Sequence, residues 1–155
     1  TYMGIGEAKA VTILAACELG KRRQASDIEK RLNLNSAISI YNYMYPKVQD
    51  KDIEEAWILL LNQKLDLIEA KCISHGGITG TAIDVRIILK EALLRNATAI
   101  ALCHNHPSGN PRPSREDDNI TNSLKKAADT MHIYFVDHVI VAQQHFYSYR
   151  EEGRI

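Results

Sequence analysis

Two short apolar runs constrain the fold of this chain more than any other feature. One is Ala56 to Leu61, which reads AWILLL, and the other is Thr98 to Cys103, which reads TAIALC. Short, unbroken apolar runs with β-branched or aromatic residues are typical of strands that are buried on both faces. We therefore expect both runs to be strands of a sheet that helices cover, with the first run as a central strand.

The segments around these runs predict the rest of the sheet. Residues 65–74 partly alternate between apolar and polar side chains, as a strand with one wet face does. Further strands are expected at 132–141 and 145–149, and helices at 84–96 and 115–130. The resulting order, β-β-α-β-α-β-β, predicts an α/β domain with a mixed β-sheet flanked by helices.

The first third of the chain favours helices only. Residues 7–23 carry apolar side chains at helical spacing, Ser26 and Asp27 can cap a short helix to about residue 32, and residues 38–48 predict another helix. The polar residues 49–52 then mark a boundary. We expect a small helical segment over residues 1–50 and the α/β domain over residues 51–155.

Composition excludes several broad classes of protein. Hydrophobic residues make up 45% and the formal net charge is zero, so no overall field would recruit nucleic acid or an anionic membrane. No apolar run approaches the roughly 18 residues of a membrane span, and no signal-peptide pattern is present. Cys17, Cys72 and Cys103 form no C-x-x-C pair, so we expect reduced core cysteines of a cytoplasmic protein. Because the first residue is Thr1, we expect the chain to be part of a longer protein.

The strongest functional signal follows the second apolar run. His104 and His106 stand at its carboxyl end, and residues i and i+2 of a strand face the same side. They can therefore chelate one ion together, and Asp117 can complete the set if the loop folds back. Three protein ligands leave a fourth position open to water, which is the outline of a hydrolytic zinc site.

Ser114 and Asp117 also have a purely structural interpretation. Ser-x-x-Asp approximates a capping box at a helix N-terminus. The two interpretations can coexist, because a cap would hold Asp117 in the first helical turn while its other carboxylate oxygen meets the metal. The prolines of this loop restrict its backbone and Gly109 supplies a sharp turn, so we expect the loop to hold the ligands stiffly.

The pattern His104-x-His106, seven residues, Ser114, two residues and Asp117 resembles the signature of the JAMM (JAB/MPN-plus) zinc metalloproteases. The strings HNHPSG from His104 and REEGRI at the end of the chain, together with Asp137-His138, resemble the RadC-like branch of that family. Further matches extend the resemblance over nearly the whole chain. The resemblance implies a JAB/MPN fold, which is cytidine-deaminase-like, and one Zn²⁺ per chain.

The resemblance also implies a role for each residue of the site. His104, His106 and Asp117 would bind Zn²⁺, and Ser114 would hydrogen-bond the oxyanion of a tetrahedral intermediate. The general base would be a glutamate just ahead of the first strand, where Glu55 fits and Glu54 is the alternative. The implied enzyme is a metallopeptidase or isopeptidase whose peptide or protein substrate is unidentified. Asp137-His138 would form a buried polar pair between strands, with contact to a zinc ligand as the alternative.

Other functions compete with hydrolysis. Gly4-Ile5-Gly6 before a helix resembles half of a helix-hairpin-helix, whose backbone amides hold DNA phosphate, and Lys21 to Arg23 would add charge. The alternative function is therefore a DNA-associated repair or recombination accessory protein, in which the domain mainly binds nucleic acid or partners. A zinc nucleobase deaminase is set aside, because the chain lacks His-x-Glu and Pro-Cys-x-x-Cys. An inactive scaffold and a homo-oligomer are left open.

Overall fold

The computed structural model of the chain describes residues 6–27, 32–76 and 83–155. Contacts divide the chain into two compact units, Thr1–Arg31 and Leu32–Ile155. The first unit contains helix α1, Glu7–Asp27, which confirms the expected helix and extends it. Ser26 and Asp27 belong to this helix and do not begin a second one, so that expectation was wrong.

Most of the expected DNA-binding hairpin lies outside the described residues. This holds for Gly4 and Ile5 and for the side chains of Lys21 to Arg23. In the parts of the chain that the structure describes, no helix is both long and apolar enough to cross a membrane.

The second unit is built on a mixed five-stranded sheet, as expected. Its strand order is β2-β1-β3-β4-β5; β3 and β4 pair in parallel, and the other neighbours pair antiparallel. The two apolar runs form the neighbouring strands β1 and β3, which are almost entirely buried. The strands are β1 Glu55–Leu61, β2 Leu67–His75, β3 Ala99–Asn105, β4 Tyr134–Ala142 and β5 His145–Ser148.

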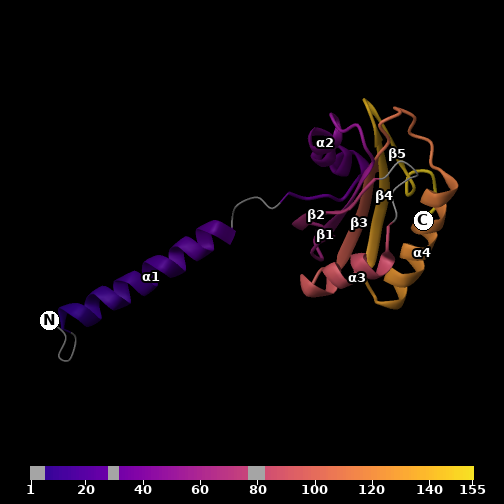
Figure 1. Cartoon of the computed structure of the whole chain (residues 1–155). Helices are drawn as coiled ribbons and strands as arrows, with labels where there is room; N and C mark the ends of the chain where they lie inside the picture. The colour runs from indigo at the N-terminus through magenta and orange to yellow at the C-terminus, as the bar shows by residue number, and fades with distance from the viewer. Residues whose placement is uncertain (1–5, 28–31, 77–82) are drawn as a thin grey trace. The chain divides into compact units, whose positions relative to one another are not determined.

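Helices cover both faces of the sheet. Figure 1 shows α2, Ala37–Val48, on one side and α3, Val85–Leu94, with α4, Arg115–Thr130, on the other. Strand alternation decides which apolar side chain meets which helix. Leu59 and Leu61 of β1 join the cluster under α2, whereas their neighbours Ile58 and Leu60 join the cluster under α3 and α4.

Helix α2 belongs to the sheet domain, which moves the boundary from the expected residue 50 to residue 31. Leu34, Ile40, Met44 and Val48 are 0–2% exposed and pack on the sheet in one hydrophobic cluster. Burying a large aliphatic side chain contributes about 1.5–3 kcal/mol. A polar stretch at residues 49–52 therefore marks a turn inside the domain and not its edge.

The three cysteines occupy different environments. Cys103 is buried, Cys72 is half-buried and Cys17 is exposed on α1. The expectation of a core position is confirmed for Cys103 and wrong for Cys17.

Candidate metal centre

Strand β3 delivers two histidines to one end of the sheet. His104 lies between Ala56 of β1 and Ile140 of β4, and it is 3% exposed. The His106 N–H donates to the Val141 carbonyl at 2.8 Å, which keeps the chain beside β4 past the end of the strand. Gly109 then turns the loop with φ of +76°, a backbone conformation that favours glycine.

Helix α4 brings Asp117 back to the two histidines. Ser114 caps the helix: its hydroxyl accepts from the Asp117 N–H at 3.1 Å, and the Asp117 Oδ2 accepts from the Ser114 N–H at 2.7 Å. The Ser114 hydroxyl also donates to Oδ2 at 2.8 Å. The cap thus engages Oδ2 and leaves Oδ1 turned toward His104, so capping and contact with the histidines coexist.

The expected ligand atoms converge. His104 Nε2 lies 3.0 Å from His106 Nε2 and 3.1 Å from Asp117 Oδ1, and His106 Nε2 lies 3.6 Å from Asp117 Oδ2. Nitrogen and oxygen atoms bound tetrahedrally to one ion at about 2.0–2.2 Å would stand roughly 3.4 Å apart. The three side chains therefore form a group that could hold a metal ion.

A chain of hydrogen bonds fixes which nitrogen of His104 faces this point. The Thr121 hydroxyl must donate to the Asp117 carbonyl at 2.6 Å, so at 2.6 Å it accepts from Nδ1–H of His138. Burial holds the pKa of His138 well below its usual value, so its ring is neutral and its Nε2 is an acceptor. That Nε2 accepts from Nδ1–H of His104 at 2.8 Å. In a neutral His104 the lone pair is therefore on Nε2.

His106 is oriented in the same way by a backbone group. Its Nδ1–H donates to the Asn110 carbonyl at 2.7 Å, so its lone pair is also on Nε2 when the ring is neutral. Two lone pairs 3.0 Å apart repel unless a proton or a metal ion lies between them. Burial lowers the pKa of His106, but its hydrogen bonds to Asp117 and Asn110 outweigh burial and raise it. The same histidines hold the pKa of Asp117 far below its usual value against its own burial.

Asp137 and His138 each fulfil one of the two roles expected for the pair. The His138 side chain contacts the candidate ligand His104, which was the less favoured interpretation. The Asp137 side chain instead ties β4 to the C-terminal segment, because it accepts from the Ser148 hydroxyl at 2.5 Å and the Arg150 N–H at 3.0 Å. Adjacent residues of a strand point to opposite faces, so only one of the two can reach the cluster.

Strand alternation points to Glu54, and not Glu55, as the glutamate on the sheet face of the histidines. The Glu55 carboxylate contacts Trp57 at 3.1 Å, Lys51 at 3.2 Å and His75 at 3.3 Å. Glu55 shares the sheet face of Trp57, whereas alternation puts Glu54 on the face of Ala56 and its neighbour His104. The charge of Glu54 also contributes to the raised pKa of His106.

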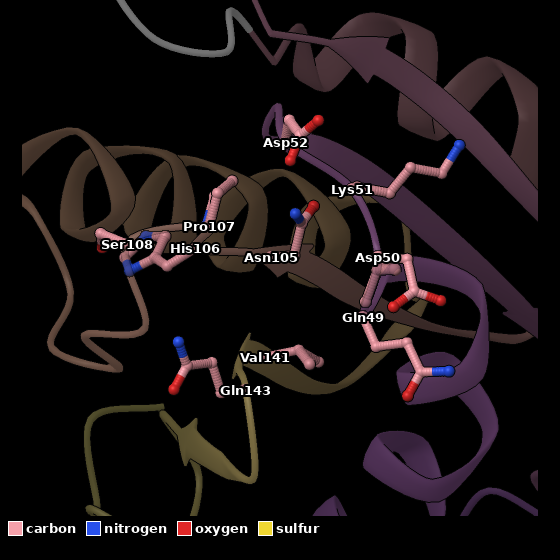
Figure 2. A pocket seen from close by; sticks show the side chains of 11 residues that line it. Gln49, Asp50, Lys51, Asp52, Asn105, His106, Pro107, Ser108, Val141 and Gln143 are labelled. Atoms are coloured by element: carbon pink, nitrogen blue, oxygen red, sulfur yellow. The ribbon is translucent and has the colours of Figure 1, made fainter.

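Two pockets adjoin the cluster. One, of about 680 Å³, lies beside His106; Figure 2 shows residues 49–52 on one side of it and His106, Pro107 and Ser108 on the other. The second, of about 660 Å³, adjoins Asp117 and is lined by residues of α4 and by residues 83–86. Each pocket is therefore lined by one of the candidate ligands, His106 in the first and Asp117 in the second.

Sequence reasoning missed two of the residues that help to orient the ligands, Thr121 and Asn110. Thr121 lies one helical turn after Asp117, and this i, i+4 spacing is the one signal that could have indicated it. Asn110 contributes only its backbone carbonyl, so its side chain carried no signal.

A mixed sheet between helices, with a His-His-Asp group at the end of a parallel strand pair, defines a class of α/β domain with a candidate metal centre. The sequence matches the RadC-like JAB domain over residues 34–154, and the chain belongs to this family. This match also begins within the second compact unit, ahead of α2.

Curated relatives support the same assignment. A UPF0758 protein of Flavobacterium johnsoniae is 42% identical over 152 residues, which cover 98% of this chain and 66% of the relative. A UPF0758 protein of Porphyromonas gingivalis is 38% identical over 99% of this chain and 68% of its own length. One from Thermotoga maritima is 37% identical over 98% of this chain and 68% of its own length. This chain thus spans about two thirds of the length of these relatives.

Proposed function

We propose that the chain is a zinc-dependent amide hydrolase of the JAMM type, acting as a peptidase or isopeptidase. The observation that carries the proposal is the pair of imidazole lone pairs that the hydrogen-bond network aims at one point beside a carboxylate. Two imidazoles and one carboxylate are a ligand set found in catalytic zinc sites, which keep a further position open. The family membership of the chain is compatible with a hydrolase.

His104 Nε2, His106 Nε2 and Asp117 Oδ1 would hold the ion. Bound zinc would supply a coordinated water whose pKa is about 7 instead of 15.7, so that hydroxide is available at neutral pH. The chain's own residues supply the rest. His138 and Asn110 keep both rings in the required tautomer, because each accepts the proton on the remote ring nitrogen.

Glu54 would serve as the general base and then pass the proton to the leaving amine. Its position one residue before β1 sets it on the sheet face of His104. Glu55, the residue that the family resemblance favoured, has its carboxylate occupied by Lys51, Trp57 and His75. A base must reach the proton that it abstracts, and geometry precedes pKa in that choice.

Ser114 would donate to the developing oxyanion. Its hydroxyl now donates to Asp117 Oδ2, but the residue is exposed and the hydroxyl can turn away. Asp117 would keep the hydrogen bond from the Ser114 backbone N–H, so the ligand stays in place while the hydroxyl moves. The pockets beside His106 and Asp117 would receive the two sides of the cleaved amide.

The test compares Glu54→Gln with Glu55→Gln on a library of peptide and isopeptide amides. Both variants should bind zinc at the His104 cluster like the wild type, because neither carboxylate is a ligand in that cluster. Glu54→Gln should lose at least ~10²-fold in turnover, the usual contribution of a general base, and Glu55→Gln should keep most of it. Zinc-dependent turnover that survives in Glu54→Gln would overturn the assignment of the base. A library that the zinc-loaded wild type does not cleave at all would overturn the proposed hydrolase.

A further inference from the structure

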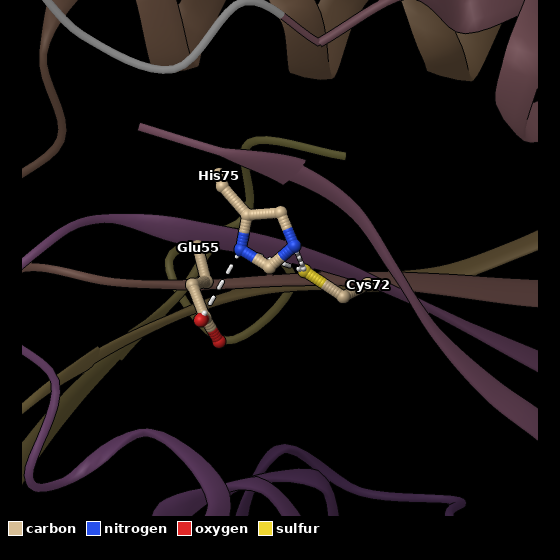
Figure 3. Close-up of side chains that lie close together, drawn as sticks. All are labelled: Glu55, Cys72 and His75. Carbon is tan, nitrogen blue, oxygen red and sulfur yellow. Dashed lines mark hydrogen bonds and ion pairs between the residues drawn. The ribbon is translucent and has the colours of Figure 1, made fainter. Parts of the chain in front are cut away.

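A second group of metal-binding side chains lies where β1 and β2 pair, and it is separate from the His104 cluster. Glu55 begins β1, and Cys72 and His75 lie near the end of β2. One potential ligand atom from each lies within 4.8 Å of the others. Figure 3 shows the three side chains turned toward one another, with the imidazole between the carboxylate and the thiol.

A β-bulge brings these residues together. Residues three apart on a regular strand point to opposite faces, so Cys72 and His75 should diverge. Here Ala56 pairs with Ser74 and Trp57 pairs with Cys72, which leaves Ile73 as an extra residue on β2. Cys72 and His75 therefore both fall on the face of Glu55, while Ile73 packs into the cluster on the other face.

The ligand atoms lie close enough to share one ion once the exposed imidazole rotates, because the Cys72 Sγ now lies almost equally far from both ring nitrogens. His75 Nδ1 is 3.3 Å from Glu55 Oε1, and the Cys72 Sγ is 3.8 Å from Nδ1 and 3.7 Å from Nε2. In a tetrahedral zinc site with Zn–S near 2.3 Å and Zn–N or Zn–O near 2.1 Å, the corresponding separations are roughly 3.6 Å for S–N and 3.4 Å for N–O. A thiolate, an imidazole and a carboxylate are all ordinary ligands of Zn²⁺.

The group combines a buried carboxylate with an exposed imidazole, as a metal site open to solvent requires. Glu55 is 3% exposed, and its Oε2 is held by the indole N–H of Trp57, so Oε1 is fixed toward the group. The His75 side chain is 66% exposed, which leaves a path for the ion and space for a water ligand. Lys51 Nζ lies 3.2 Å from Oε1 and occupies the place of a competing cation, but its side chain is 46% exposed and can move into solvent.

We propose that Glu55, Cys72 and His75 form a second divalent-metal site, suited to Zn²⁺ or Co²⁺, at the β1–β2 end of the sheet. The adjacent residues Glu54 and Glu55 would then serve two different centres on opposite faces of one strand. This inference needs neither hydrolysis nor occupancy of the His104 cluster, so its outcome can be separated from that of the proposed function.

Cobalt titration of the metal-free full chain tests the proposal, because only a cysteine ligand gives a near-ultraviolet thiolate-to-cobalt charge-transfer band. The wild type should show this band and bind a second Co²⁺ beyond the one at the His104 cluster. Cys72→Ser should lose the band and one ion, whereas His104→Ala should lose one ion and keep the band. Cys17→Ser is the matched control, since this exposed cysteine lies on α1, and it should change neither quantity.

The Lys51→Met variant adds a test that misfolding cannot mimic, because this substitution is expected to tighten metal binding. Removal of the competing ammonium should tighten cobalt binding in the band-forming site by roughly two- to fivefold, the size of a partly exposed ion pair. A wild type without the band, a band that persists in folded Cys72→Ser, or weaker binding in Lys51→Met would each overturn the second site.

Discussion

Substitution of His138 by phenylalanine tests whether the hydrogen-bond chain behind His104 controls metal binding. The phenyl ring keeps the approximate size of the imidazole and its stacking on Tyr149, whose ring lies 4.9 Å away at an interplanar angle of 3°. It removes the acceptor for Nδ1–H of His104 at 2.8 Å and the donor to the Thr121 hydroxyl at 2.6 Å. His104 then lacks the partner that keeps its lone pair on Nε2.

The hydrogen bonds that the substitution removes set the expected loss of zinc affinity and of stability. Removal of the partner of a metal-binding histidine typically costs about 10–100-fold in metal affinity, which corresponds to about 1.4–2.7 kcal/mol. The Nδ1–H of His104 is also left buried without an acceptor, since this residue is 3% exposed. An unpaired buried polar group costs about 1–3 kcal/mol, so the free energy of unfolding should fall as well.

Competition with a chromophoric chelator at constant pH measures the zinc affinity, and circular dichroism during heating measures the fold. Asp137→Asn is the matched control, because Asp137 is the neighbouring buried residue but faces Ser148 and Arg150. The control should lower stability and leave zinc affinity within about threefold of the wild type, less than ~0.7 kcal/mol. A folded His138→Phe variant with wild-type zinc affinity would refute the reasoning.

Three further predictions concern the titration of His106, the turn at Gly109 and the start of the sheet domain. Because the pKa of His106 is raised in the folded chain, protonation of this ring stabilises the metal-free protein. This stabilisation should be complete below pH ~6.5 and be lost as pH rises through the folded pKa, while the zinc affinity measured by calorimetry rises over the same range. A zinc affinity that falls over this range would contradict the prediction. Gly109→Ala should lower the free energy of chemical unfolding by about 1–2 kcal/mol, because of the φ of +76°, and should also weaken zinc binding. Gly153→Ala, with a φ of +66° in open space, should lower stability alone, and equal zinc affinities in the two variants would argue against a stiff loop. Residues 32–155 should unfold cooperatively by themselves, and residues 51–155 should not, because loss of α2 uncovers Leu59 and Leu61; cooperative unfolding of the shorter piece would restore the boundary near residue 50.

Local sequence patterns predicted most of the fold and the central residues of the site. The order of strands and helices was predictable because unbroken apolar runs and helical periodicity are properties of neighbouring residues. His104 and His106 share a strand end, and Ser114 and Asp117 share a helix cap, so their proximity needed one loop to fold back.

What could not be predicted depends on pairing between distant segments. The choice between Glu54 and Glu55 needs the register of β1 against β3, because one residue of slip exchanges the two faces. The approach of Cys72 to His75 needs the bulge at Ile73, which has no glycine to indicate it. The place of α2 in the sheet domain could not be predicted, because the apolar face of a helix does not indicate which sheet it packs against.

Zinc-edge anomalous diffraction from crystals of the zinc-loaded chain tests the central claim most directly, since it locates the ion without reference to activity. We predict an anomalous peak within bonding distance of His104 Nε2, His106 Nε2 and Asp117 Oδ1, with His138 still hydrogen-bonded to the far side of the His104 ring. Zinc-loaded crystals without a peak between these three atoms would contradict it.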